Sequence, residues 1–248
     1  MASPAVLTLA AIAGVSAAPL LAVLVLLRGE EKLVSALPHL LSLAVGGLLG
    51  AAFFHLMPES IEQLGGGLRF SGGVFAGFFG FLLLERFLRL HQHPRRAEDA
   101  HHRPEPYAVL NLAGDAVHNF IDGAIIAAAF MTDPRLGFAT TVAVGLHEVP
   151  QEIGDFAVLV HGGVAPRRAI RLNLAVATTA FAGAAATLVA GAHMEAAVHA
   201  LLPVSAGSFL YIAASDLIPE LQRETRRGRS IAQLSLLSCG ALLMLWLA

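Results

Sequence analysis

The chain has 248 residues, of which 56% are hydrophobic and only 14% are charged, and its formal net charge is −2. Soluble domains carry nearer a quarter of charged residues, so this composition excludes an ordinary soluble domain and indicates a membrane protein. The net charge indicates no particular partner, and the sequence contains no nucleic-acid-binding motif. Cys239 is the single cysteine, which excludes an internal disulfide or a thiolate cluster.

Long uncharged stretches predict the transmembrane helices. About 20 apolar residues cross a bilayer as a helix. We expect eight spans, at 5–27, 34–57, 70–90, 107–131, 136–160, 169–192, 198–220 and 230–248. The loops are short, so residues 1–248 are predicted to form a single transmembrane domain. The first span is long and lacks a preceding basic segment, so it is interpreted as a retained helix rather than a signal peptide.

The basic residues predict the orientation. The eight spans place all but two of the 16 Lys and Arg residues on one side, the exceptions being Arg69 and Arg135. Because cytoplasmic loops carry the positive excess, both termini are predicted to lie outside. Short loops without an ectodomain suggest a prokaryotic plasma membrane, with a compact organellar membrane as the alternative.

The fourth and fifth spans differ from the rest because they carry ionisable side chains. The fourth has a polar face spaced i, i+3, i+4 and i+7, made of Asp115, His118, Asn119 and Asp122. The fifth has two neighbouring stripes, made of His147 and Gln151 and of Glu148, Glu152 and Asp155. The short turn at 132–135 makes the two helices antiparallel neighbours, so we expect the polar faces to meet. Charged groups at membrane depth line polar paths or pair with one another.

These residue types favour a metal site. Imidazole nitrogen with carboxylate and amide oxygen suits Zn²⁺, Fe²⁺ and Mn²⁺, and the lack of cysteine argues against Cu(I). Pro150 has no N–H, so the carbonyl of Leu146 loses its helical donor and could face an ion or water. Any single one of these polar residues could instead make a helix–helix hydrogen bond or an ion pair. Six ligand-capable groups on two adjacent helices favour the ion site.

Two short segments indicate an internal repeat. The second span ends in "HLMPE", residues 55–59, and the seventh ends in "DLIPE", residues 216–220. We expect Pro58 and Pro219 to kink their helices, with Glu59 and Glu220 just beyond. The match pairs spans two with seven and four with five. This order predicts an all-α membrane protein with eight transmembrane helices in a 3+2+3 inverted-repeat bundle, an arrangement typical of transporters.

The longest loop, residues 91–106, is rich in histidine, proline and charge and is predicted to be cytoplasmic and flexible. Its histidines are His91, His93, His101 and His102. Such tracts can capture metal loosely, and a solvated linker with incidental histidines is the alternative.

These features together resemble the ZIP (Zrt/Irt-like) family of divalent-metal transporters over essentially the whole chain. The resemblance rests on "HNFIDG" at 118–123, "HEVPQEIGD" at 147–155, the eight spans, the outside termini and the His-bearing loop. It implies a helical 3+2+3 homodimer that carries Zn²⁺, or related ions such as Fe²⁺, Mn²⁺ and Cd²⁺, towards the cytoplasm without an organic cofactor. The implied transport site comprises His118, Asn119, Asp122, His147, Glu148 and Gln151. It also implies His55 and Asp216 as auxiliary ligands on the path.

The sequence departs from the family pattern in two places. Gln151 stands where one large branch, with HExPHExGD, has a second histidine. The sixth span offers no carboxylate, only Asn173, Thr178, Thr179 and Thr187, so a binuclear centre with a sixth-span carboxylate is not expected. We expect the ion to bind first at His118, Asp122 and His147. On the inner side Glu152, Asp155 or the loop histidines then accept it.

Two other functions fit some of these residues. HExxH on a helix is the zinc-metalloprotease signature, so an intramembrane zinc-dependent hydrolase is one alternative. Gln151 replaces its second histidine and Pro150 is expected to break the helix between the two positions, so we predict that the protein is not an enzyme. A membrane metal sensor that binds without transport is the other alternative. No GxxxxGK[ST] motif is present, so the energy must come from the ion gradient or another coupling.

Overall fold

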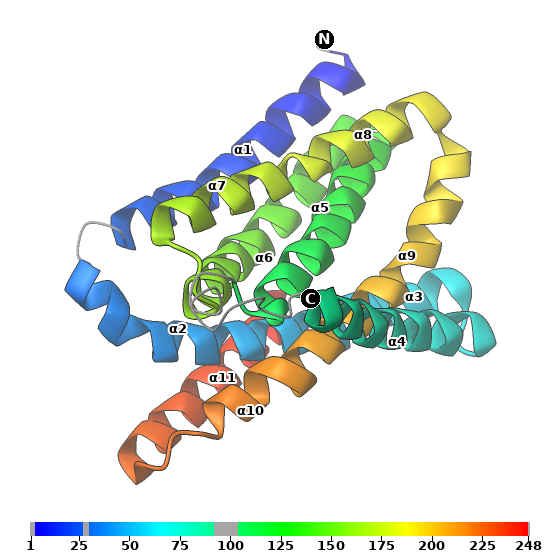
Figure 1. Cartoon of the computed structure of the whole chain (residues 1–248). Coiled ribbons are helices and arrows are strands. Elements are labelled where there is room, and N and C mark those ends of the chain that lie inside the picture. Colours follow the sequence, from blue (N-terminus) through cyan, green and yellow to red (C-terminus); the bar gives the residue numbers. More distant parts are fainter. Residues whose placement is uncertain (1–2, 27–29, 92–103, 248) are drawn as a thin grey trace.

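The computed structural model describes residues 3–26, 30–91 and 104–247, and these ranges contain helices and no strands (Figure 1). The helices are α1 (Pro4–Leu26), α2 (Glu30–Gly50), α3 (Met57–Leu64), α4 (Leu68–His91), α5 (Pro106–Thr132), α6 (Pro134–His161), α7 (Pro166–Ala177), α8 (Thr179–Ala190), α9 (Ala192–Tyr211), α10 (Ile218–Leu221) and α11 (Arg227–Leu247). Two π-helical segments, η1 (Ala51–Leu56) and η3 (Ile212–Leu217), join α2 to α3 and α9 to α10. Each predicted span thus coincides with one helix or with consecutive helical segments.

Four helical stretches in the described ranges are by themselves long and apolar enough to cross a membrane: Ala36–Leu64, Pro166–Ala190, Ala196–Leu221 and Arg227–Leu247. Helices α5 and α6 are as long, with 27 and 28 residues, but they carry the ionisable residues predicted to form the site. Because those side chains are buried inside the bundle rather than facing outwards, both helices fit a membrane protein. The fold is an all-α membrane bundle.

The sixth span is not one uninterrupted helix. It breaks at Thr178, between α7 and α8. The hydroxyl of the next residue, Thr179, donates to the carbonyl of Ala116 on α5 at 2.9 Å and so ties the break to the fourth span. Helix α5 packs closely along α8, and a Cβ atom on Gly183 would lie 1.9 Å from the carbonyl oxygen of Phe120. This close approach fixes α5, which carries half of the site.

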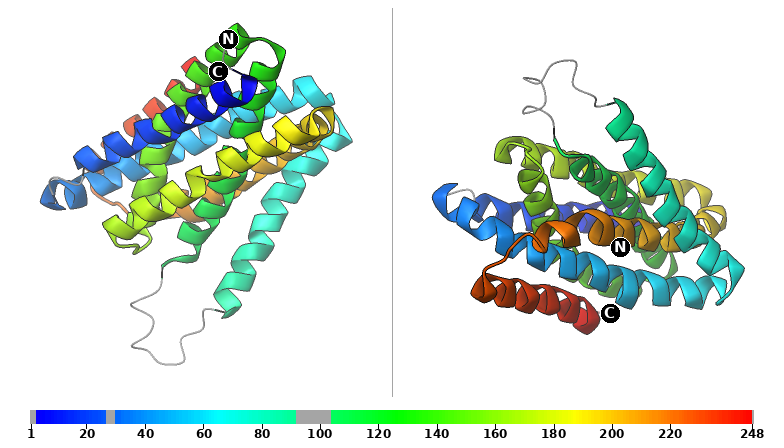
Figure 2. Two further views of the ribbon diagram at one scale, coloured as in Figure 1. Left: turned by 90° about the horizontal axis from the view of Figure 1, so that it is seen from above. Right: turned by 60° about the horizontal axis from the view of Figure 1, so that its bottom comes forward.

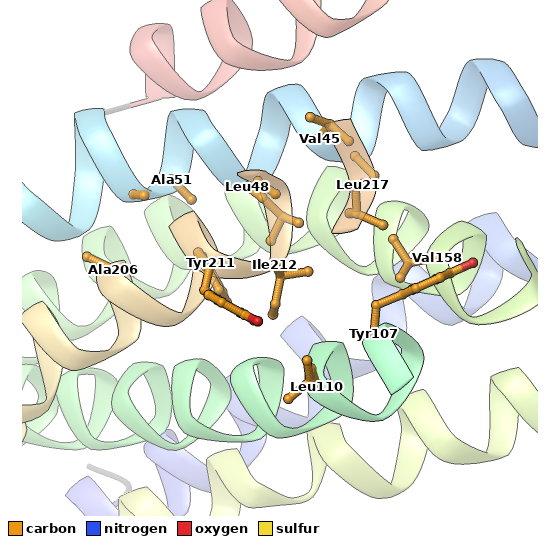
Figure 3. Close-up of a cluster of buried hydrophobic side chains, with 14 of the residues drawn as sticks. Val45, Leu48, Ala51, Tyr107, Leu110, Val158, Ala206, Tyr211, Ile212 and Leu217 are labelled. Carbon is orange, nitrogen blue, oxygen red and sulfur yellow. The ribbon is translucent and has the colours of Figure 1, made fainter. Parts of the chain in front are cut away.

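Helices distant in the sequence form the remaining pairs. Helix α11 lies along α2, and α4 packs on α9 (Figures 1 and 2). A buried hydrophobic cluster joins these pairs to α5 and α6 through residues such as Val45, Leu110, Val158 and Ile212 (Figure 3). The cluster lies towards the beginning of α5 and the end of α6 and fills the bundle there.

The two repeat-like segments share a local backbone. In η1 the N–H of Met57 donates to the carbonyl of Ala52, and in η3 the N–H of Ile218 donates to that of Ala213. Each π-helical segment ends just before the prolines, Pro58 and Pro219. A proline cannot donate to the carbonyl four residues earlier, which favours such a local widening, and π-helical turns are frequent at functional sites. The helices therefore accommodate these prolines with π-helical turns. The sequence indicated kinks at the prolines and did not predict these turns.

Pro150 lies inside α6, which continues from Pro134 to His161. The expectation that Pro150 breaks this helix between His147 and Gln151 is therefore wrong. The predicted loop at 91–106 begins at the last residue of α4, His91, and ends at the first residue of α5, Pro106. Its other histidines, His93, His101 and His102, lie outside the described residues, so the structure does not test the prediction that they capture metal.

Candidate metal centre

A single residue separates the two helices that carry the site. Helix α5 ends at Thr132, and Asp133 caps α6 by accepting hydrogen bonds from the N–H groups of Arg135 and Leu136, at 2.8 and 3.3 Å. Pro134 at the first helical position is suited to this start because its fixed φ matches the helix. The turn makes α5 and α6 antiparallel neighbours, as predicted (Figure 1). Buried polar side chains of the two helices meet, as between His147 and Asp122.

Four ligand-capable side chains meet between α5 and α6, and we call them the four-ligand site: His118, Asp122, His147 and Glu148. One ligand atom from each lies within 4.8 Å of the others, and all four residues are buried. The Nε2 atom of His147 lies 3.1 Å from Oδ2 of Asp122. The Nε2 atom of His118 lies 3.6 Å from the same oxygen and 3.8 Å from Oε1 of Glu148.

This spacing fits a metal ion. Two ligands bound about 2.0–2.1 Å from a tetrahedral zinc lie about 3.4 Å apart, and the three measured separations lie on either side of that value. His118 is fully buried, and neither of its ring nitrogens has a hydrogen-bond partner among the described residues. Leaving a buried polar atom unpaired costs about 1–3 kcal/mol, and coordination of an ion by Nε2 would remove that penalty.

A cavity opens onto the four-ligand site from one side. It has a volume of about 510 Å³ and is lined by Asp122 and His147 together with His55, Glu59 and His199. The His55 ring centroid lies 4.8 Å from that of His147, so segment η1 brings this predicted auxiliary residue next to the site. Glu59 lines the same cavity and lies four residues after His55 in the chain.

Asn119 and Gln151 are buried beside the four-ligand site. The amide nitrogen of Asn119 donates to Oδ1 of Asp115 at 2.8 Å, so it faces away along α5. Gln151 lies one turn along α6 from His147, and its amide oxygen has no hydrogen-bond donor in the described ranges. Both amides are neutral, and an amide oxygen is a weaker ligand for zinc than the imidazole of a second histidine would be.

Three further predicted residues form a group beside the four-ligand site, within about two helical turns of it along α5 and α6. We call Asp115, Glu152 and Asp155 the inner carboxylate cluster. Oδ1 of Asp155 accepts a hydrogen bond from Asn111 of α5 at 2.8 Å. Asn173 of α7 donates to the main-chain oxygen of Glu152 at 3.3 Å. The polar interior therefore continues beyond the four ligands, towards the start of α5.

The last two predicted residues, Asp216 and Glu220, line a different cavity of about 430 Å³, which none of the four ligands lines. Arg89 of α4 approaches Asp216 at 3.7 Å. Glu220 pairs with Arg223 at 2.7 Å and with Nε2 of His161 at 3.4 Å. Both carboxylates thus lie beside cationic or titratable side chains.

Sequence reasoning missed several polar residues that line these cavities or support the helices around them: Glu85, Arg89, Asn111, His161, His199 and Tyr211. Buried Glu85 accepts hydrogen bonds from both Arg89 and the Tyr211 hydroxyl, which links α4 to α9. None of the missed residues belongs to a motif. Helical spacing could have identified only Asn111, because it lies four residues before Asp115 on the same helical face.

An all-helical membrane bundle with a buried imidazole and carboxylate site defines a class: membrane proteins that bind divalent metal ions. The sequence profile of the ZIP zinc transporter family matches residues 3–109 and 91–248. The chain therefore belongs to the ZIP family, which is a family of transporters and not of enzymes.

Curated relatives agree with this assignment. The chain is 34% identical over 222 residues to zinc transporter ZIP13 of Pongo abelii, covering 84% of this chain and 66% of that protein. It is 33% identical over 252 residues to zinc transporter ZIP13 of Mus musculus, covering 86% and 70%. It is 32% identical over 299 residues to zinc transporter SLC39A7 of Mus musculus, covering 86% and 63%. The chain thus spans roughly two thirds of the length of these relatives.

Proposed function

We propose that this protein carries divalent metal ions, zinc foremost, across a membrane through the four-ligand site between α5 and α6. The observation that carries the proposal is the group of four buried ligand atoms within 4.8 Å of one another, next to a cavity that Asp122 and His147 line. Two imidazoles and two carboxylates suit Zn²⁺, and Fe²⁺, Mn²⁺ and Cd²⁺ are the other candidates. The relatives named as zinc transporters support zinc as the first ion to test.

The site is suited to transit rather than permanent binding. Asn119 and Gln151 add neutral, weak oxygen ligands, and an open cavity gives solvent access to part of the site. A structural zinc site is closed and tetrahedral, whereas a site that exchanges its ion keeps an accessible position. The path proposed here leads from His55 and Glu59 past the four ligands to the inner carboxylate cluster, and then to Asp216 and Glu220.

The distribution of basic residues supports the orientation in the membrane on which we propose inward transport. The first turns of α7 carry Arg167, Arg168 and Arg171, and the segment before α11 carries further arginines. The positive-inside rule assigns these ends to the cytoplasm. The 510 Å³ cavity is then outside, and the ion moves inwards, with both chain termini outside.

The shared π-helical geometry of η1 and η3 supports the proposed 3+2+3 inverted repeat. The packing of α2 on α11 and of α4 on α9 also supports it, because an inverted repeat exchanges these two pairs. Access from one cavity to the four-ligand site suits alternating exposure of that site. A homodimer in a prokaryotic plasma membrane completes the proposal and rests on the family resemblance and the short loops.

Uptake into proteoliposomes tests this function. The purified chain is reconstituted, and Zn²⁺, Fe²⁺, Mn²⁺ and Cd²⁺ are offered separately beside His118→Ala and His147→Ala variants. We expect saturable uptake that both substitutions abolish. Metal binding without flux above that of empty vesicles would contradict the proposal and favour a sensor, while turnover of a peptide or lipid lost in Glu148→Gln would favour a hydrolase.

A further inference from the structure

The 430 Å³ cavity contains cationic side chains of its own. Two arginines and three carboxylates are among the side chains that line it: Arg89, Arg223, Glu105, Asp216 and Glu220. The Nη1 atom of Arg223 lies 2.7 Å from Oε2 of Glu220, and the Nη2 atom of Arg89 lies 3.7 Å from Oδ1 of Asp216. Carboxylate oxygens are the ligands that hard cations such as Mg²⁺ prefer. Here a guanidinium faces each of these two carboxylates instead.

Arg89 is also held by a second carboxylate, that of buried Glu85 on the same helix. Oε1 of Glu85 accepts a hydrogen bond from Nε of Arg89, and Oε2 accepts one from the hydroxyl of Tyr211. The Tyr211 ring in turn packs edge-on against that of Phe78, with 5.2 Å between the ring centroids. Because both oxygens of Glu85 are bonded, this carboxylate fixes one edge of the guanidinium.

The contact of Arg89 with Asp216 is looser than its contact with Glu85. A separation of 3.7 Å is longer than a hydrogen bond, so charge alone draws the two groups together. The Asp216 side chain is 6% exposed, and its other oxygen, Oδ2, has no hydrogen-bond partner among the described residues. The Arg89 side chain is 52% exposed and has room to move. A cation that binds Asp216 can therefore displace the guanidinium while Arg89 keeps its hydrogen bond to Glu85.

We propose that Arg89 is a tethered counter-ion that keeps free cations away from Asp216, and is thus a specificity-determining residue at this end of the path. The guanidinium cannot diffuse away, so its charge opposes the approach of any other cation. Mg²⁺ gives up its bound water reluctantly, so we expect it not to displace Arg89. The exclusion of cations rests on these contacts alone. Its role in protecting the path from cytoplasmic cations rests on the proposed function.

Thiol labelling inside the cavity tests the proposal on the full chain in detergent. Ser215 is exposed and lines the same cavity, so Ser215→Cys in a Cys239→Ser background provides a single reporter thiol. The rates of its reaction with a positively charged and a negatively charged methanethiosulfonate reagent are compared. We expect Arg89→Gln to raise the ratio of the two rates by about five- to tenfold, because loss of one nearby positive charge changes them in opposite directions.

Mg²⁺ provides a second readout. At millimolar concentration and constant ionic strength it should slow the positively charged reagent in Arg89→Gln and leave that rate unchanged where Arg89 is present. Arg89→Lys keeps the charge and should restore most of the exclusion. Arg86→Gln is the matched control, because Arg86 is exposed on the same helix and has no salt bridge in the described part of the chain. It should match the parent in both readouts.

Glu85→Gln/Arg89→Gln separates exclusion at Asp216 from a change of net charge, since the double substitution leaves the net charge unchanged. It also leaves no unpaired charge at position 85, so it decides the matter if gel filtration shows that Arg89→Gln does not fold. The proposal predicts that Mg²⁺ slows labelling in the double variant as well, because Asp216 has lost its guanidinium.

An unchanged rate ratio in folded Arg89→Gln, an equal change in Arg86→Gln, or a double variant that Mg²⁺ does not affect would overturn the proposal. Failure of the transport proposal has a different signature, namely no zinc uptake into proteoliposomes, whatever the labelling rates.

Discussion

Segments η1 and η3 share a π-helical backbone followed by proline, but their surroundings are opposite. His55 of η1 lies beside His147 in a cavity that reaches the four-ligand site. Asp216 of η3 lines a cavity that reaches none of the four ligands and is approached by Arg89. Tyr107, which lines the second cavity, belongs to a buried hydrophobic cluster together with Leu110, Val158 and Leu217 (Figure 3).

The comparison shows that the same π-helical turn before a proline can present different side chains, His55 in η1 and Asp216 in η3, to two different cavities. A titratable imidazole stands at the open end, where an ion would arrive. At the other end the guanidinium of Arg89 approaches the Asp216 carboxylate, a position that the proposed path gives to a departing cation. Under that proposal, release of the ion would require the Arg89–Asp216 contact to change.

The largest effect is expected from removing an imidazole of the four-ligand site. His118→Ala or His147→Ala should weaken zinc binding by at least about 100-fold, because even groups that only orient metal ligands are worth about 10–100-fold. Calorimetric titration with Zn²⁺ measures this. His39→Ala, an exposed histidine on α2, is the control and should bind like the wild type. An equal loss of zinc affinity in all three variants would show that the effect is not specific to the histidines of the four-ligand site.

The next largest effect is expected on stability, from disrupting the close packing of α5 on α8. Gly183→Val should lower stability by about 1–3 kcal/mol because its side chain would collide with the main chain of Phe120. Gly80→Val, also in a helix but with open space around its Cβ position, is the matched control. Thermal unfolding in detergent compares the two. A similar Tm for both variants would contradict the close packing of α5 on α8.

The comparison of the two π-helical segments predicts different kinetic effects. His55→Asn should raise the KM for uptake by up to about tenfold, since His55 contacts a ligand at the accessible side but is not one of the four. Asp216→Asn should lower the maximal rate with a smaller change in KM, because it acts after binding. Uptake measured over a series of ion concentrations separates KM from the maximal rate. A changed maximal rate in His55→Asn with a changed KM in Asp216→Asn would contradict the roles proposed for these two residues.

The smallest effect is expected at the corner between α5 and α6. Asp133→Ala removes the side chain that caps α6 and should cost about 1 kcal/mol. Asp133→Asn keeps a capping oxygen and should restore most of the Tm. If the two variants lose equal stability, the cap is not what holds the corner.

The sequence could predict the helices because uncharged runs and basic loops mark them directly. It could not predict the break at Thr178 or the π-helical turns, because these depend on contacts such as that of Thr179 with α5. At Pro150 the sequence predicted a break that is absent from α6, because the helix continues through a residue that by itself disfavours helix.

The site was predictable as far as helical faces go. Spacing along α5 and α6 predicted all four residues of the four-ligand site, but it placed Glu148 on a different stripe from His147. Only the packed helices bring both to His118 and Asp122, because their rotation about their axes is set by tertiary contacts. The Glu85–Tyr211 contact, across 126 residues, leaves no local pattern at all.

The most direct test of the account is a crystal structure of the protein with bound zinc, with diffraction data collected at the zinc absorption edge. The account predicts an anomalous peak between His118, Asp122, His147 and Glu148, which disappears in the His147→Ala variant. A peak elsewhere in the bundle, with none between those four side chains, would contradict it.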